Sequence, residues 1–301
     1  MSLNDYVSFW TLVKMPSSKP KQKSIMSKDF LVGADPEFFV CDRNTGEIVS
    51  SIGKVGGTKD KPLLLGEIWD NDPRSKMFCL EDNVLVEINV PPVSDYGAHY
   101  SLFQKARTLL QNHLAKANLS FKGYASYNFP KEKLDDPRAF MFGCDPDWNA
   151  WTGEINPKPF CENVNFRSAG GHIHLGIKGL SQTQKENLVK WLDIFVGFGL
   201  AMCDPDKDRK KLYGKAGAMR YKPYGLEYRV PSNWWAGKAM SGNAYVSRAL
   251  FRAIEHAVDK INDPISADDK EAVIAYLNND DKNATSVITK KYAQPIMELM
   301  G

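Results

Sequence analysis

The order of hydrophobic patterns along the chain predicts an α+β fold, with a mostly antiparallel sheet and helices packed on one of its faces. Strand-like segments come first, and the order is then strands, helix, strand, helix, strand, helix. This order lacks the regular β-α-β alternation that is typical of a parallel sheet. Because the helices would cover one face of the sheet, the other face would be free to carry a site.

Strand-like segments dominate the chain from Phe30 onward. LVGADPEFFV and EIVSSIG flank the turn-like sequence DRNTG, and this arrangement predicts a β-hairpin. FCLEDNVLVEINVPP predicts one further strand that ends at Pro91 and Pro92, because proline cannot donate a hydrogen bond within a sheet. GGHIHLGIKG predicts a short strand with glycine at both ends, and GLEYRVP predicts another.

Amphipathic helices are predicted between and after these strands. The first is capped by Ser94, and the second opens with a capping box of Ser181 and Gln184. The third runs from about Gly242 to Ile261. The apolar residues at helical spacing, which should face the sheet, are Leu102, Phe103, Ala106, Leu109, Leu110 and Leu114, then Leu188, Trp191, Leu192, Phe195 and Phe198, then Val246, Leu250, Ile254 and Ile261.

The remaining segments lack these periods. The stretch from Gly123 to Ser168 is irregular, and loops of that length inside a compact domain are usually functional. The polar and basic stretch SSKPKQKS near the start is typical of a flexible linker. The sequence therefore predicts an N-terminal extension of residues 1–28, a main domain of residues 29–262 and a C-terminal helical appendage of residues 263–301.

Composition excludes several classes of protein. A net charge of +3 over 301 residues gives no general reason to expect binding to nucleic acid. The cysteines are odd in number and form no CxxC pair, which argues against a disulfide framework or a thiolate zinc site and for a reducing compartment. The start of the chain does not read as a secretory signal, and no run approaches 18 apolar residues. We therefore expect a cytoplasmic protein with no membrane span.

Four strand-like segments place polar or charged residues at positions i and i+2, so that both side chains point to the same face of the sheet. An ordinary half-buried strand shows the same alternation, and a single pair could be a solvated strand end. Four such pairs together predict a site. The pairs are Asp35 and Glu37, Glu87 and Asn89, His172 and His174, and Glu227 and Arg229.

Carboxylates that meet on one face of a sheet would need cations. Two bare carboxylates about 4 Å apart repel by about 4 kcal/mol at an effective dielectric constant of about 20. Oxygen-rich clusters suit Mg²⁺ or Mn²⁺, whereas Zn²⁺ would prefer more histidine or cysteine. The HxH pattern of His172 and His174 is typical of a metal site, with structural histidines as the alternative. Gly170 and Gly171 before it would let a ligand or a loop approach the backbone closely.

A basic segment with several glycines, RKKLYGKAGAMRYKPYGLEYR, could wrap a polyanion, although such a segment taken alone is most often a solvated loop. Metals that face basic side chains are the arrangement that phosphoryl transfer requires. A second loop, IGKVGGTKDKP, lacks the full pattern of a P-loop. The basic residues of the first segment are Arg209, Lys210, Lys211, Lys215, Arg220, Lys222 and Arg229.

Several motifs resemble those of one enzyme superfamily. GADPEFF, GGHIHLG and GLEYRVP resemble strands of glutamine synthetases, and EDNVLVEINVPP resembles an acidic segment of glutamate–cysteine ligases. Their combination, from about Leu31 to Trp235, is most similar to the phage-encoded carboxylate–amine ligases, or amidoligases. The resemblance implies that residues 29–262 form a glutamine-synthetase-like catalytic domain, with a curved antiparallel sheet that binds ATP and two or three divalent metals. If the protein is phage-encoded, its compartment would be the host cytoplasm.

The resemblance also implies roles for individual residues. Glu37, Asp82 and Glu87 would hold one metal, and Glu81 could replace Asp82. Asp35, His172 and Glu227 would hold another metal against the phosphates of the nucleotide. The residues expected to meet phosphate or an acyl phosphate, as catalytic or cofactor-binding groups, are His174, Arg209, Lys215, Arg220 and Arg229.

The resemblance has departures. Asp35 stands where glutamine synthetases have a glutamate, and the spacing from Asp82 to Glu87 is shorter than theirs. The chain shows no counterpart of their separate N-terminal domain, so ammonia as the amine and a ring-shaped oligomer are not carried over, and the oligomeric state stays open.

The function that this implies is ATP- and magnesium-dependent ligation of a small-molecule or peptide carboxylate to an amine. ATP would phosphorylate the carboxylate, and an amine would attack the acyl phosphate. Asp145, Asp147 or an acid of the CDPDKD stretch could take the proton of the amine. The alternatives are a metal-dependent hydrolase or oxygenase that uses HxH with Glu87 or Glu227, a kinase-like enzyme, and a non-catalytic protein that keeps the fold.

Overall fold

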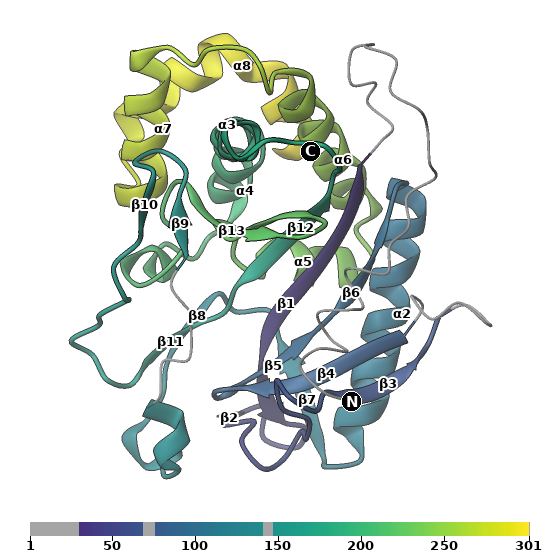
Figure 1. Cartoon of the computed structure of the whole chain (residues 1–301). Helices are drawn as coiled ribbons and strands as arrows, with labels where there is room; N and C mark the ends of the chain where they lie inside the picture. Colours follow the sequence, from purple (N-terminus) through teal and green to yellow (C-terminus); the bar gives the residue numbers. More distant parts are fainter. Residues whose placement is uncertain (1–29, 69–75, 141–146, 301) are drawn as a thin grey trace.

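A computed structural model describes residues 30–68, 76–140 and 147–300, so the predicted extension of residues 1–28 lies outside the described residues. Within these ranges, one antiparallel sheet of twelve strands forms the centre of the fold, and helices pack against it (Figure 1). The predicted α+β class is confirmed. The strands of the main path, in spatial order, are β10, β9, β13, β14, β12, β1, β5, β4 and β3.

The long strand β1 (Leu31–Asp42) organises the sheet. Its first half pairs with β12 (Gly171–Gly176) and its second half with β5 (Leu85–Ile88). The other strands of the sheet are β2 (Ile48–Val49), β3 (Leu63–Glu67), β4 (Lys76–Asp82), β6 (Val90–Val93), β7 (Leu119–Lys122), β9 (Trp148–Asn149), β10 (Glu154–Ile155), β13 (Ala218–Lys222) and β14 (Gly225–Tyr228), and β8 (Ser126–Asn128) pairs separately with β11 (Phe166–Ser168).

The predicted hairpin of β1 and β2 is confirmed. The single strand predicted between Phe78 and Pro92 is wrong, because this segment forms β4, β5 and β6. Asn83 adopts a φ of 55° and turns the chain between β4 and β5. Pro91 and Pro92 lie inside β6, which pairs with β1 at Val90 and Val93 across an irregularity in the ladder. Proline is tolerated at such positions because no regular ladder hydrogen bond is required of it.

The helices match the predicted pattern closely. α2 (Tyr96–Ala115) is capped by Asp95 rather than by Ser94, because the Asp95 side chain accepts the hydrogen bond of Ala98 N. The capping box at the start of α3 (Gln182–Leu192) is confirmed. All the apolar residues expected inside are buried except Leu109, which is half-buried. The other helices are the π-helix η4 (Asp193–Gly197), α4 (Phe198–Cys203), α5 (Trp234–Met240), α6 (Ala244–Asp259), α7 (Ala267–Asn279) and α8 (Thr285–Met300), with short 3-10 turns η2 (Lys131–Lys133), η3 (Pro137–Phe140), η5 (Asp208–Lys211) and η6 (Lys282–Ala284).

The two faces of β1 have different neighbours. Val32, Ala34 and Phe38 belong to the large core cluster that includes the helices, whereas Asp35 and Glu37 alternate with them and point to the opposite face. Farther along that opposite face, a small second cluster around Phe39 is covered by the irregular loop. The face that carries the acidic residues is therefore the one that the helices leave uncovered, as the sequence predicts.

The C-terminal segment contributes to the same core as the sheet. Val273 and Leu277 of α7 and Ile288 of α8 are buried in the large cluster, so the segment packs as part of the main body. None of the described helices combines the length and the apolar composition that crossing a membrane requires.

Candidate active site

The register of the central strands brings the predicted pairs together. Asp35 of β1 lies opposite His172 of β12, and Glu37 of β1 lies opposite Glu87 of β5. On the other side of β12, His174 lies opposite Glu227 of β14. Side chains from four separate stretches of sequence thus project from one face of three neighbouring ladders.

Glu37, Asp82 and Glu87, which we call the acidic group, offer carboxylate oxygens that all lie within 4.8 Å of one another. The backbone N–H of Gly170 donates a hydrogen bond of 2.6 Å to Glu37, and Lys59 Nζ lies 3.1 Å from Asp82 Oδ1. Burial raises the pKa of Glu87 well above its usual range, and the charges of Asp35, Asp82 and Glu37 raise it further. Burial also raises the pKa of Glu37. Three crowded oxygen ligands with this charge excess fit a hard divalent cation such as Mg²⁺ or Mn²⁺.

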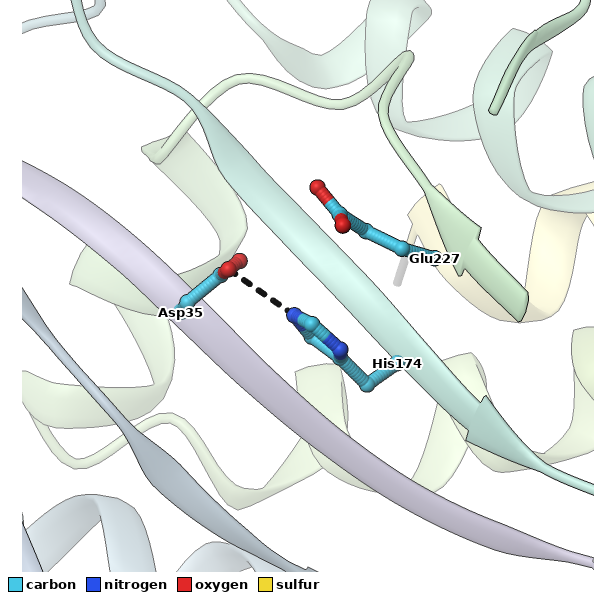
Figure 2. Close-up of side chains that lie close together, drawn as sticks. All are labelled: Asp35, His174 and Glu227. Carbon is cyan, nitrogen blue, oxygen red and sulfur yellow. Dashed lines mark ion pairs between the residues drawn. The ribbon is translucent and has the colours of Figure 1, made fainter. Parts of the chain in front are cut away.

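Asp35, His174 and Glu227, which we call the histidine group, converge from β1, β12 and β14 (Figure 2). His174 Nε2 lies 2.9 Å from Asp35 Oδ2, and its Nδ1 lies 2.5 Å from the hydroxyl of Tyr224. The second ring nitrogen of a metal-binding histidine commonly has such a partner, which fixes the orientation of the ring. A set of one nitrogen and two carboxylates within 4.8 Å fits Mn²⁺ better than Mg²⁺, because imidazole is a softer ligand than a carboxylate oxygen.

Both histidines lie beside Asp35 and Glu227. His174, which was predicted at the phosphate, groups with these two carboxylates. His172, which was predicted with them as a metal ligand, also lies near both, and its role as a ligand stays a prediction. His172 Nδ1 lies 3.3 Å from Asp35 Oδ1 and 3.8 Å from Glu227 Oε1, between the two groups. Residues i and i+2 of a strand share a face, so the pattern could not decide which histidine approaches the carboxylates more closely.

Basic side chains surround Glu227. Lys222 Nζ lies 2.7 Å from its Oε2 and Arg220 Nη1 lies 3.6 Å from its Oε1, and Arg229 also forms an ion pair with it. Burial alone would raise the pKa of Glu227, but the charges of Arg229, His174 and Lys222 hold it well below its usual range. Arg229 Nε also lies 3.3 Å from Asp147 Oδ2. Lys222 and Tyr224 are absent from the predicted site residues, although both lie in the basic segment that the sequence singled out.

Arg209 and Lys215 have different surroundings. The buried guanidinium of Arg209 donates hydrogen bonds to the carbonyls of Ala169 and Val230, and it lines the same cavity as Glu37, His172 and Arg229. The amine of Lys215 instead donates to the carbonyl of Asn278, at the end of α7. Lys215 lines a different cavity, beside Asp147. The prediction that Lys215 joins the site is therefore wrong, because position within a glycine-containing segment does not fix the direction of a side chain.

Two further residues have structural tasks. Glu81 was a predicted replacement for Asp82, and this is wrong, because its carboxylate accepts hydrogen bonds from the backbone N–H groups of Gly53, Val55 and Gly56. It anchors the second glycine and lysine loop. Asn89 lies beyond the end of β5, and its side chain accepts a hydrogen bond from Phe78 N rather than facing the site with Glu87.

The glycines before the HxH motif serve close approach, as expected. A Cβ on Gly171 would overlap the carbonyl of Ser232, which belongs to the loop after β14. A Cβ on Gly170 would lie 2.5 Å from His172 Nε2. Among the acids considered as the base, Asp147 lies beside Arg229, Asp204 accepts a hydrogen bond from Ser232, and Asp145 lies outside the described residues. The identity of the base stays a prediction.

Comparison with known proteins adds independent findings. The structure is similar to a Plasmodium falciparum glutamine synthetase, with 11% identity and a TM-score of 0.37 over 77% of this chain, and it spans about half (52%) of that chain. It is also similar to GmaS in its ADP complex, with 10% identity and a TM-score of 0.43 over 90% of this chain and 67% of that one. No curated protein matches the sequence.

A family model described as phage phiEco32-like COOH.NH2 ligase-type 2 matches residues 161–299. The matched region begins before the HxH strand and includes β13, β14 and all helices from α3 onward. Residues 161–299 thus carry the sequence signature of the phage-type carboxylate–amine ligases, the family that the motifs of the whole chain resemble.

Proposed function

We propose that this protein is an ATP- and magnesium- or manganese-dependent ligase that joins a carboxylate to an amine through an acyl phosphate. The observation that carries the proposal is that the acidic group, the histidine group and the arginines Arg209 and Arg229 all lie on one side of the sheet. A site for a nucleoside triphosphate needs both divalent cations and fixed basic hydrogen-bond donors. The acidic group would bind the cations, and the buried arginines would be the donors.

The reaction would have two steps. The carboxylate of the first substrate would attack the γ-phosphorus of ATP, forming an acyl phosphate and releasing ADP. The amine would then attack the acyl carbon, so that an amide bond forms, the C–O bond to phosphate breaks, and the amine gives up a proton. Divalent ions held by the acidic group and the histidine group would neutralise charge on the phosphate oxygens.

The residues of the chain would orient and stabilise the reacting groups. Arg209 and Arg229 are buried and present a planar fork that matches phosphate oxygens. Arg220, which is partly exposed and lies beside Glu227, would contact the charge that develops on the transferred group. The cavity wall formed by Leu212 and Tyr213 would help to exclude water from the acyl phosphate.

The test is ADP release by the purified full chain with ATP, Mg²⁺ or Mn²⁺, and pools of carboxylates and of amines. A ligase releases ADP only when both pools are present, and ¹⁸O in the carboxylate then appears in the released phosphate. ADP release with the carboxylate pool alone, and a stable phosphorylated product, would instead indicate a kinase. Hydrolysis or oxidation of substrates with ATP left intact would overturn the proposal in favour of a metal-dependent hydrolase or oxygenase.

A further inference from the structure

Behind the site, on the helix side of the sheet, lies a fully buried acid that the proposed reaction does not use. Asp193 is the first residue of the π-helix η4 and has no exposed surface. Among the described lysines and arginines, none forms an ion pair with it. Its carboxylate instead accepts three hydrogen bonds, from Tyr228 Oη at 2.7 Å, Gly217 N at 2.7 Å and Trp151 Nε1 at 2.6 Å.

These donors belong to the segments that carry the basic half of the site. Tyr228 follows Glu227 on β14 and precedes Arg229, so its side chain points to the helices while that of Glu227 points to the site. Gly217 immediately precedes β13, which carries Arg220. A single carboxylate therefore connects both strands of the β13–β14 hairpin to the helix layer.

Trp151 extends the same connection to the next hairpin. It lies in the turn between β9 and β10, and β9 pairs with β13. Asp147, just before β9, forms the ion pair with Arg229. The Asp193 carboxylate thus also holds the element that positions the partner of Arg229.

Two glycines leave room for this arrangement. A Cβ on Gly197, the last residue of the π-helix, would overlap the Tyr228 hydroxyl. Gly217 has a φ of +79°, and a Cβ there would lie 2.8 Å from the ring of Trp151. π-helical turns are rare and occur often at functional sites. Here the turn and the glycines allow a tyrosine hydroxyl, a backbone N–H and an indole N–H to reach one buried carboxylate.

We propose that Asp193 is a positioning residue that fixes the β13–β14 hairpin through Tyr228 and Gly217, and thereby sets the affinity of the histidine group for a divalent ion. The inference rests on the proposed function, because it assumes that Asp35, His174 and Glu227 bind a metal. Of these three ligands, Glu227 alone is on the hairpin. Displacement of the hairpin therefore changes the distance from Glu227 to the other two and leaves the acidic group as it is.

A carboxylate is better suited to this position than an apolar residue or a hydroxyl. It offers acceptors for all three donors, and removal of it would leave buried N–H groups without partners, which costs about 1–3 kcal/mol for each group. Burial raises the pKa of Asp193 to about 7, since no positive charge compensates it. Burial of a carboxylate without a compensating positive charge costs free energy, so its presence here indicates a structural or functional role.

The test is Mn²⁺ binding, followed by electron paramagnetic resonance of the free ion, in the wild type, Asp193→Ala, Asp193→Asn and Tyr228→Phe. We expect Asp193→Ala to weaken Mn²⁺ binding at the histidine group about 10-fold and to leave Mn²⁺ binding at the acidic group unchanged. Tyr228→Phe should weaken binding at the histidine group as well, by a smaller factor. Asp193→Asn should retain most of the affinity, because the amide keeps an acceptor for Gly217 and Trp151.

The matched control is Asp269→Ala. Asp269 is also a buried acid of the helix layer, but its partners are Lys291 and Tyr292 of α8. Its substitution should lower the melting temperature and leave both Mn²⁺ affinities unchanged. Wild-type affinities in both Asp193→Ala and Tyr228→Phe would overturn the positioning role alone; if Asp193→Ala does not fold, Tyr228→Phe decides. A wild type that binds no Mn²⁺ would overturn the proposed function and this inference together.

Discussion

Glu37 and Glu87 face each other directly across the ladder between β1 and β5. Like charges at such positions destabilise a sheet, and Asp82 adds a third carboxylate to the same place. Burial is the main cause of the raised pKa values of Glu37 and Glu87, and the charge of Asp82 raises both further. The chain therefore accepts an unfavourable contact in the metal-free protein at the place where a cation would remove it.

Substitution of Glu87 should separate stability from function. In Glu87→Gln the cross-strand repulsion disappears, so the free energy of unfolding without divalent ions should rise by about 1 kcal/mol. Mn²⁺ binding at the acidic group and ADP release should be lost. Urea denaturation in EDTA and Mn²⁺ titration measure the two effects. Glu67→Gln, on strand β3 at the end of the main path of the sheet, removes an exposed carboxylate and should change neither. Lower stability together with full activity in Glu87→Gln would contradict the assignment.

As the pH rises, the metal-free protein should lose stability while the stabilisation that Mn²⁺ provides should grow. Glu37 and Glu87 have raised pKa values, so the folded protein binds more protons than the unfolded chain above about pH 4.5, and the free energy of unfolding of the metal-free protein falls as the pH rises. Asp35 and Glu227 have lowered pKa values, and their contribution is lost only as the pH falls below about 4.5. Because metals bind deprotonated carboxylates, Mn²⁺ should raise the melting temperature more at about pH 8 than at about pH 5.5.

Thermal unfolding in EDTA and in Mn²⁺ across this range tests the expectation. Burial also raises the pKa of Asp193, to about 7, so its titration likewise lowers the free energy of unfolding as the pH rises through this range. Glu87→Gln removes one titrating group but leaves Asp193 in place, so this variant should show a shallower slope in EDTA rather than none. A metal-free protein that gains stability between about pH 5 and 8 would contradict the raised pKa values.

Much of the site could be predicted because a strand fixes which residues share a face. Asp35, Glu37 and Glu227 interrupt apolar strands at a period of two, and buried charged residues on a sheet are rare unless they are paired or bind a ligand. The antiparallel order also follows from the sequence of patterns. These predictions use local rules only, and the register between β1, β12 and β14 then brings the residues together.

The remaining features depend on contacts that the local pattern does not contain. Glu81 and Asp82 are adjacent and point to opposite faces, and only the pairing of β4 with β5 decides which one meets Glu87. Lys215 turns toward α7 because of Asn278, which is distant in sequence. Asp193 interrupts an apolar helix as a solvent-exposed residue would, and only the approach of Tyr228 shows that it is buried.

Arg229 should matter for folding as well as for chemistry. It is buried and pairs with both Glu227 and Asp147. Its loss would leave a buried carboxylate without its main compensating charge, so Arg229→Ala should lower the free energy of unfolding by about 3–5 kcal/mol. Arg220→Ala, at the more exposed position, should cost less than about 1 kcal/mol while it reduces ADP release. Urea denaturation of both variants measures the difference, and equal losses of stability would contradict it.

The neighbours Glu81 and Asp82 allow a comparison within one dipeptide. Asp82→Asn should weaken Mn²⁺ binding at the acidic group with little change in stability. Glu81→Gln should keep the metal site but lower the free energy of unfolding by about 1–2 kcal/mol, because a neutral amide is a weaker acceptor for the loop N–H groups of Gly53, Val55 and Gly56. Mn²⁺ titration and thermal unfolding distinguish the two, and the reverse pattern would show that Glu81 is the ligand.

Gly170→Ala tests whether His172 must keep its place between the two groups. The backbone of Gly170 has no positive φ, so alanine fits the conformation, but its Cβ would lie 2.5 Å from His172 Nε2 and the ring must move. That ring contacts Asp35 and Glu227, and Gly170 N donates to Glu37, so Mn²⁺ affinity should fall at both groups while the fold is kept. Gly46→Ala is the control, since Gly46 has a φ of +74° in open space and its substitution should lower stability without changing affinity. In Gly170→Ala/His172→Ala the clash is absent, so the double variant should bind Mn²⁺ no more weakly than His172→Ala alone, and a purely additive loss would show that the ring is not the target of the clash.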